Sequence, residues 1–112
     1  MNFEKVKFEI FIPCEYLPVL REGLHDAGAG RIGNYDHCLS VSEVSGFWRP
    51  LEGSIPFEGT TGQLSSGQEC KVEVVCGREN VQSVIDAIKS VHPYEEPVFY
   101  IIPLLNSLYA QD

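Results

Sequence analysis

Strict alternation of apolar and polar side chains opens the chain and recurs along it. Every second residue is apolar over residues 4–12, the pattern of a β-strand that buries one face. The same period predicts strands at 35–44 and 68–76, and a shorter one at 47–49. A last strand is predicted at 98–104, where both faces are apolar, so we expect it to be central in the sheet or buried in an assembly.

Two segments have the longer period of an amphipathic helix. The first, residues 15–27, has an apolar stripe that consists of Leu17, Leu20, Leu24 and Ala27. Gly28 and Gly30 should end it, and because the glycine-rich run 28–33 follows a helix, we interpret it as a turn and not as a dinucleotide cradle. The second helix, residues 79–91, has an apolar stripe that consists of Val81, Val84, Ile85, Ile88 and Val91.

Two prolines frame the connection after the second helix, in the run His92-Pro93-Tyr94-Glu95-Glu96-Pro97. Proline fixes its own φ and disfavours helix at the residue before it. The helix should therefore end at Val91 or His92, and Glu96 should be extended. We expect Pro93 or Pro97 to have a conformational role rather than a chemical one. The peptide bond before either proline could be cis.

The order of predicted elements is β-α-β-(short β)-β-α-β. Two βαβ-like halves of similar length predict an α+β fold, a ferredoxin-like βαββαβ sandwich with an antiparallel sheet and both helices on one face. We expect a single domain over residues 1–112, with its core at about 4–43 and 67–105. An inserted hairpin and loop is expected at about 44–66. Its connection, residues 50–62, is long and rich in Gly and Pro, which is typical of functional or interfacial loops.

The composition is that of a globular protein, and it excludes two classes of partner. Of 112 residues, 44% are hydrophobic and 21% charged, which is enough apolar material for one core. The net charge is −8 with only eight Lys and Arg residues, so the chain lacks the basic surface that nucleic acids require. No apolar run approaches the roughly 20 residues of a membrane span, and no signal peptide opens the chain. We therefore expect a cytoplasmic protein.

The four cysteines, Cys14, Cys38, Cys70 and Cys76, show no CxxC spacing. Cys70 and Cys76 should share one face of one strand, about 20 Å apart at about 3.3 Å per residue, which is too far to ligate one ion. In a cytoplasmic protein, we expect all four to be free thiols that pack as small hydrophobes.

Three blocks, in this order, resemble a domain found in Nif-three-like proteins. They are Gly28-Ala29-Gly30-Arg31-Ile32-Gly33-Asn34-Tyr35-Asp36-His37-Cys38, then Pro50-Leu51-Glu52-Gly53-Ser54-Ile55-Pro56-Phe57-Glu58-Gly59, and the HPYEEP run of residues 92–97. In full-length members of that family, this unit is inserted in a larger, metal-binding α/β domain that holds the two-metal ligands. The resemblance therefore implies the fold and assembly in threes, but no metal centre and no hydrolase activity.

The HPYE turn also resembles that of the CutA-type cation-tolerance proteins. Those proteins share the ferredoxin-like fold, assemble as trimers and are similar in topology to the PII signalling proteins. This second resemblance covers mainly residues 91–97.

His92, Glu95 and Glu96 could form a metal or acid–base cluster, since imidazole and carboxylate are natural metal ligands. The structural interpretation is that His92 ends the helix, where a partly protonated imidazole favours the helix dipole, and that the carboxylates are solvated. His37 and Cys38 are neighbours on a predicted strand, so they should face opposite ways and cannot chelate together.

The aromatic residues of the inserted segment suit burial between subunits, with packing inside one chain as the alternative. Our leading hypothesis is a small, cytoplasmic, non-catalytic module that forms a homo-oligomer, with a trimer favoured over a dimer. It would bind a small ligand or a protein partner at clefts between subunits. The expected ligand or interface residues are His92, Tyr94, Glu95, Glu96, Trp48 and Phe57.

The alternative function is that of a divalent-cation-binding or cation-tolerance protein of CutA type. Its candidate ligands are His92, Glu95 and His37, and a divalent metal would be its cofactor. A third hypothesis is an enzyme whose site forms only in the oligomer. No other cofactor is expected, and neither nucleic acid nor a membrane is expected as a partner.

Overall fold

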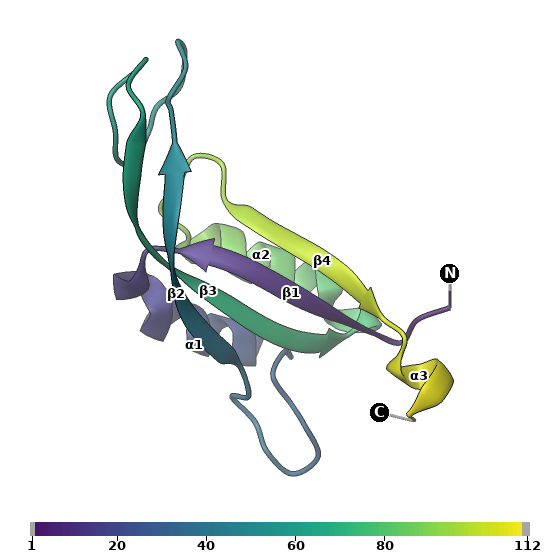
Figure 1. Cartoon of the computed structure of the whole chain (residues 1–112). Coiled ribbons are helices and arrows are strands. Elements are labelled where there is room, and N and C mark those ends of the chain that lie inside the picture. The colour runs from purple at the N-terminus through teal and green to yellow at the C-terminus, as the bar shows by residue number, and fades with distance from the viewer. Residues whose placement is uncertain (1, 111–112) are drawn as a thin grey trace.

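The computed structural model describes residues 2–110 and has the seven main elements that Figure 1 labels, with two short 3-10 turns between them. In chain order they are β1 (Lys5–Ile12), the 3-10 turn η1 (Cys14–Tyr16), α1 (Leu17–Asp26), β2 (Ser40–Trp48), β3 (Ser65–Gly77), the 3-10 turn η2 (Arg78–Asn80), α2 (Val81–Val91), β4 (Val98–Leu104) and α3 (Asn106–Tyr109).

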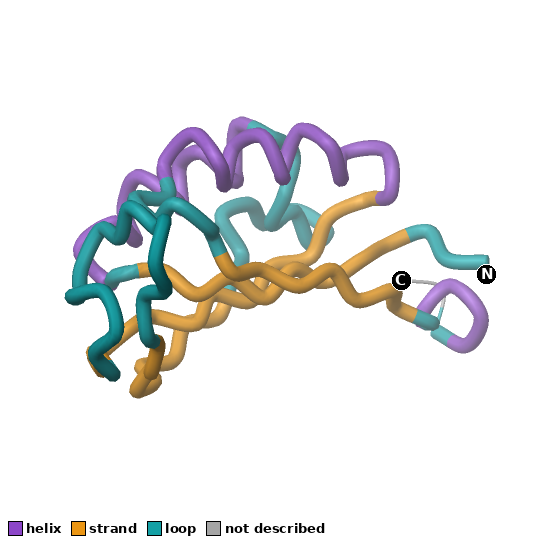
Figure 2. The backbone as a smooth tube through the Cα atoms, turned by 90° about the horizontal axis from the view of Figure 1, so that it is seen from above, coloured by secondary structure: helices purple, strands orange, loops and turns teal. Residues whose placement is uncertain are grey.

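The four strands form one antiparallel sheet in the order β2-β3-β1-β4. The register is centred on β1, where Phe8 lies opposite Val74 of β3 and Ile101 of β4. Figure 2 shows the two long helices together on one face of the sheet. The expected fold class, an α+β sandwich of ferredoxin type, is confirmed.

The core lies between the sheet and those two helices. Alternate residues of β1 point into it, and Phe8, Ile10 and Ile12 have no exposed surface. The inward positions of the other elements are Leu20 and Leu24 on α1, Val72 and Val74 on β3, and Val84 and Ile88 on α2. These faces are the ones that the period-two and helical patterns predict, so those predictions are confirmed.

The second strand begins later than its sequence pattern predicts. Residues 31–39 form a loop, and a single strand then runs without a break from Ser40 to Trp48. His37 has a φ of 57°, a left-handed backbone that cannot belong to a strand. The prediction of strands at 35–44 and 47–49 was therefore wrong in its boundaries, because β2 is an exposed edge strand whose side chains give a weak pattern.

The last strand lies at an edge of the sheet. The sequence predicted a central position or burial in an assembly. β4 pairs with β1 alone, and Val98, Tyr100 and Ile101 are exposed. A strand with two apolar faces is expected at the centre of a sheet when the sheet is considered alone. The alternative expectation, burial in an assembly, stays a prediction.

Two of the four cysteines form a disulfide, so the expectation of four free thiols was wrong. Cys14 and Cys70 are bonded with their Cα atoms 5.0 Å apart, and Cys38 and Cys76 are free. The cause is the register, which sets Ile12 opposite Cys70 and so brings the end of β1, with Cys14 just beyond it, next to β3. Sequence spacing carries no trace of that proximity, because 56 residues separate the two cysteines.

The outer end of the β2–β3 hairpin extends past the rest of the sheet, near the connection from α2 to β4 (Figure 1). α2 ends at Val91 with His92 as its extended cap, as the proline pattern predicts. No peptide bond among residues 2–110 is cis, so Pro93 and Pro97 both follow trans bonds. Within the same range, no helix is long and apolar enough to cross a membrane.

Candidate functional site

A groove of about 400 Å³ lies between the end of the β2–β3 hairpin, its loop, and the connection 92–97. Its lining comes from three separate parts of the chain: Phe47, Trp48, Arg49, Pro50, Leu51, Ser54, Pro56, Phe57, Glu58, Glu69, Tyr94, Glu95, Glu96 and Val98. Five of the six ligand or interface residues expected from the sequence are among them. The sixth, His92, lies directly beneath Tyr94.

Aromatic rings make up much of the groove wall. The ring of Tyr94 lies 5.9 Å from that of Phe57 and 6.4 Å from that of Trp48, measured between centroids. Phe57 also meets Tyr16 edge-on at 6.2 Å. The indole N–H of Trp48 donates a hydrogen bond to the carbonyl oxygen of Glu58 at 3.1 Å, which fixes the ring against its own loop.

A buried carboxylate forms the floor of the groove. Glu69 is 9% exposed and accepts a hydrogen bond from the Tyr94 hydroxyl at 2.8 Å. Burial and the Glu69 carboxylate both raise the pKa of Tyr94. The phenol therefore stays neutral, and its O–H donates a hydrogen bond to the Glu69 carboxylate.

His92 supports the groove from below and has no free ring nitrogen. Its Nε2–H donates to the carbonyl oxygen of Phe11 at 2.6 Å, and its Nδ1 accepts the backbone N–H of Tyr94 at 3.2 Å. Because a carbonyl can only accept and an N–H can only donate, these partners require the neutral Nε2–H tautomer. Burial lowers the pKa of His92, which also favours the neutral ring.

The two glutamates of the connection differ in their contacts. Glu95 accepts the backbone N–H of Ile55 at 2.8 Å and so joins the connection to the hairpin loop. Glu96 is exposed at the rim, together with Glu58. Arg49 is the one basic residue in the lining, so the groove is negative as well as aromatic.

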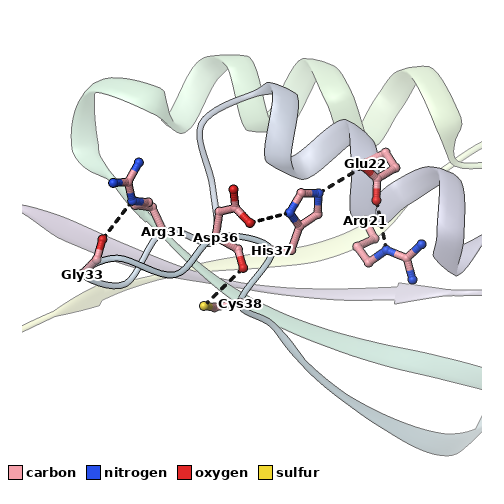
Figure 3. A network of polar contacts seen from close by, with 7 residues as sticks. All are labelled: Arg21, Glu22, Arg31, Gly33, Asp36, His37 and Cys38. Atoms are coloured by element: carbon pink, nitrogen blue, oxygen red, sulfur yellow. Dashed lines mark hydrogen bonds and ion pairs between the residues drawn. The ribbon is translucent and has the colours of Figure 1, made fainter.

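His37 lies in a different cluster, beside α1 (Figure 3). Its Nδ1 is 2.8 Å from Asp36 Oδ1, and its Nε2 is 3.0 Å from Glu22 Oε1. The hydrogen bond with Asp36, followed by that with Glu22, raises the pKa of His37. The ring of His25 stacks on His37 at 4.0 Å.

The candidate metal ligands His92, Glu95 and His37 do not come together. Within residues 2–110, the group of His, Cys, Asp and Glu side chains close enough to share an ion contains His37 with His25 and Asp36, and neither His92 nor Glu95. Sequence reasoning missed the partners of His37 because it assigned residues 35–39 to a strand. A signal was present, since Asp36 and His37 are adjacent and follow a helix whose last turn carries His25.

Sequence reasoning also missed Glu69, the floor of the groove. Glu69 lies on β3, where the alternating pattern predicts only a strand. Its place in the groove comes from its contact with Tyr94, which the sequence does not show.

Comparison with known proteins gives a close relationship over most of the chain. The Bacillus subtilis protein named GTP cyclohydrolase 1 type 2 homolog is 40% identical over 98 residues, which cover 88% of this chain and 26% of that protein. A Bacillus cereus protein described as related to NIF3 superposes with a TM-score of 0.81 at 37% identity, covering 95% of this chain and 27% of the other. The chain thus spans about a quarter of the length of the relatives that it matches.

A more distant likeness concerns the fold alone. The periplasmic divalent cation tolerance protein CutA of Archaeoglobus fulgidus superposes with a TM-score of 0.67 at 18% identity, over 90% of this chain and 84% of that one. No protein-family model matches the chain.

Proposed function

Because this chain is homologous to one segment of the NIF3-related proteins, we propose that it is a non-catalytic binding module of the kind expected from its sequence. It forms a homo-oligomer and takes a small ligand or a protein segment in the groove. The observation that carries the proposal is the convergence of Trp48 and Phe57 from one part of the chain, and Tyr94 from another, on one aromatic groove above the buried Glu69.

The lining of the groove supports binding of a flat, apolar body that carries positive charge. Binding pockets are mostly apolar with a few well-placed polar groups, and this groove has that character. Aromatic faces attract cations, and the carboxylates of Glu58, Glu69 and Glu96 add to that attraction. We therefore propose that the ligand is an aromatic or alkyl amine, or a lysine or arginine side chain of a partner.

Two features favour binding over acid–base catalysis. His92 has both ring nitrogens engaged by backbone groups, so it has no free site with which to take or give a proton. The Tyr94 hydroxyl donates a hydrogen bond to Glu69, and the pKa of Tyr94 is raised. A general acid or base works best with a pKa near the working pH. Neither group meets that requirement.

Assembly is proposed from the exposed edge of the sheet. The open face of β4 presents Val98, Tyr100, Ile102 and Leu104 in register beside β1, and its outer edge has no strand partner within residues 2–110. Exposed edges and apolar patches are commonly covered by association. We propose that a second copy of the chain covers this edge, and we favour a trimer.

A cytoplasmic location is part of the same proposal. Disulfides are rare in the cytoplasm, so the Cys14–Cys70 bond would be open to reduction there.

Ligand binding can be followed directly because Trp48 is the single tryptophan of the chain. A panel of aromatic amines, guanidines and alkylammonium compounds is tested alongside neutral isosteres of each. Binding is measured as the change in the fluorescence of Trp48. We expect cationic members to bind more tightly than their neutral counterparts, and Phe57→Ala to weaken them by about tenfold, because an aromatic–cation contact contributes up to about 2 kcal/mol.

The matched control is Leu64→Ala, since Leu64 is exposed on the same hairpin loop but does not line the groove. This variant should bind as the wild type does. Equal affinity for charged and neutral isosteres would contradict the proposed ligand class. Equal affinity of the wild type and Phe57→Ala would contradict the groove itself.

The alternative function, divalent-cation binding of CutA type through His92, Glu95 and His37, has weaker support. A metal at His92 would have to displace the backbone N–H of Tyr94 or the contact with Phe11. His37 belongs to the separate cluster beside α1.

A further inference from the structure

The cluster beside α1 has the side chains of a metal site that is separate from the groove. We propose that His25, Asp36 and His37 together bind one divalent transition-metal ion, of the class of Zn²⁺, Ni²⁺ and Cu²⁺. This inference does not depend on the function proposed for the groove, because no residue is shared between the two sites.

The three side chains are already near ligating distance. One ligand atom from each lies within 4.8 Å of the others, and Asp36 Oδ1 is 2.8 Å from His37 Nδ1. Around a zinc ion, with bonds of about 2.0–2.1 Å, neighbouring ligand atoms stand about 3.3 Å apart. Asp36 is exposed and both histidines are only half-buried, and the two stacked imidazole rings have to turn toward a common ion to reach that spacing.

The backbone holds the three ligands on two fixed elements. His25 lies in the last turn of α1. The loop that carries Asp36 and His37 is closed at its base, where Cys38 N–H donates to the Gly30 carbonyl at 2.8 Å. Gly30 N–H in turn donates to the carbonyl of Val75 on β3 at 2.9 Å. The left-handed backbone at His37 turns its ring onto that of His25, with an angle of 16° between the ring planes.

Glu22 supplies the support that a metal-bound histidine normally has. A ligating imidazole usually donates its other N–H to a carboxylate, which fixes the tautomer and strengthens the ligand. Figure 3 shows His37 between two carboxylates, with Nε2 directed at Glu22 and Nδ1 at Asp36. The ion would take the place of the proton between Nδ1 and Asp36, while Nε2–H remains bonded to Glu22.

The donor set selects the class of metal. Imidazole suits zinc, nickel and copper, whereas magnesium and calcium prefer oxygen ligands alone. Three protein ligands leave at least one coordination position for water or another small ligand. A cavity of about 550 Å³ opens beside the site and is lined by both His25 and Asp36.

The test is calorimetric titration of the untagged, metal-free chain with zinc, nickel and copper salts, and with magnesium for comparison. We expect saturation at one transition-metal ion per chain and no heat from magnesium. His25→Ala and His37→Ala should abolish the saturable binding, and Glu22→Gln should weaken it by about 10- to 100-fold. Circular dichroism of each variant establishes that it is folded.

Two controls separate this site from other sources of affinity. Glu79→Gln removes a carboxylate that lines the same cavity, and Cys38→Ser removes the nearby free thiol; both should bind as the wild type does. Nitrogen NMR shifts of the zinc complex should identify Nδ1 of His37 as the ligating atom. The proposal is overturned if the wild type does not saturate, if both histidine variants keep its affinity, or if Cys38→Ser loses it.

Discussion

At the scale of single residues, the pKa values of two histidines of this chain are shifted in opposite directions. His92 is buried and bonded to backbone groups in its neutral form, so its pKa lies below the ordinary value of 6.5. His37 lies between Asp36 and Glu22, so its pKa lies above that value. In an NMR titration of the ring protons, without metal, we expect His37 to titrate at higher pH than His92. The reverse order would show that one of these hydrogen-bond networks does not form in solution.

The lowered pKa of His92 predicts a specific dependence of stability on pH. Because the unfolded chain takes up the proton first, the stabilisation from neutral His92 is complete above about pH 6.5. It is lost as the pH falls through that value toward the lower pKa of the folded state. Carboxylates with lowered pKa, such as Glu73 and Asp36, lose their stabilising contribution only at lower pH. Their ordinary pKa values are 4.5 and 3.8.

The variant His92→Gln isolates this effect, because glutamine does not titrate. Denaturant unfolding between about pH 7 and 5 should show the wild type losing stability relative to the variant, over the range in which a histidine titrates. The titration of His37 is common to both proteins, so it cancels in the difference. Parallel pH profiles for the two proteins would mean that His92 is not held neutral.

At the scale of elements, the proline-framed connection sets the register of β4. Pro97 immediately precedes Val98, which lies opposite Phe11 of β1. We expect Pro97→Ala to lower the free energy of unfolding by roughly 1–3 kcal/mol, because the start of the strand loses its fixed φ. Pro103→Ala, in the same strand at an exposed position, gives the general effect of losing a proline and should be smaller. If Pro97→Ala unfolds at the wild-type denaturant concentration, or is no less stable than Pro103→Ala, the rigid-connection argument fails.

The disulfide joins η1 to β3 and should stabilise the chain when it is prepared under oxidising conditions. Thiol titration of the denatured, unreduced protein should detect the thiols of Cys38 and Cys76 and no others. Reduction should lower the free energy of unfolding by about 2–4 kcal/mol, since the bond closes a long loop in the unfolded chain. Cys14→Ala/Cys70→Ala should be insensitive to reductant. Detection of all four thiols before reduction would contradict the bond.

At the scale of the whole molecule, the exposed edge and open face of β4 predict association. Light scattering at micromolar concentration should give a mass above the 12.5 kDa of one chain, with three copies favoured. Tyr100→Lys places a charge on that face, where Tyr100 is 55% exposed, and should shift the protein toward the monomer. Val19→Lys, at a similarly exposed site on α1, is the control and should not. A wild-type mass equal to one chain would refute the assembly.

Local patterns in the sequence were sufficient for most of the secondary structure and for the fold class. Burial of one face of a strand or helix imposes its own period on the residues, so β1, β3, α1 and α2 could be predicted from alternation and apolar stripes. Proline acts on its immediate neighbours, and the end of α2 was therefore predictable as well. Five of the six ligand or interface residues expected from the sequence line the groove, because Phe57 and Tyr94 lie in motifs that stood out from ordinary loops and Trp48 is an aromatic residue of the inserted segment.

The tertiary structure alone decided which distant residues meet. The edge position of β4, the Cys14–Cys70 bond and the Tyr94–Glu69 contact at the floor of the groove all follow from strand order and register. The cluster of His37 depends on a loop whose left-handed backbone breaks the strand pattern that its residues suggest. A periodic pattern records only which face of its own element a side chain occupies. It carries no information about the partner opposite, because that partner is set by how the elements pack on one another.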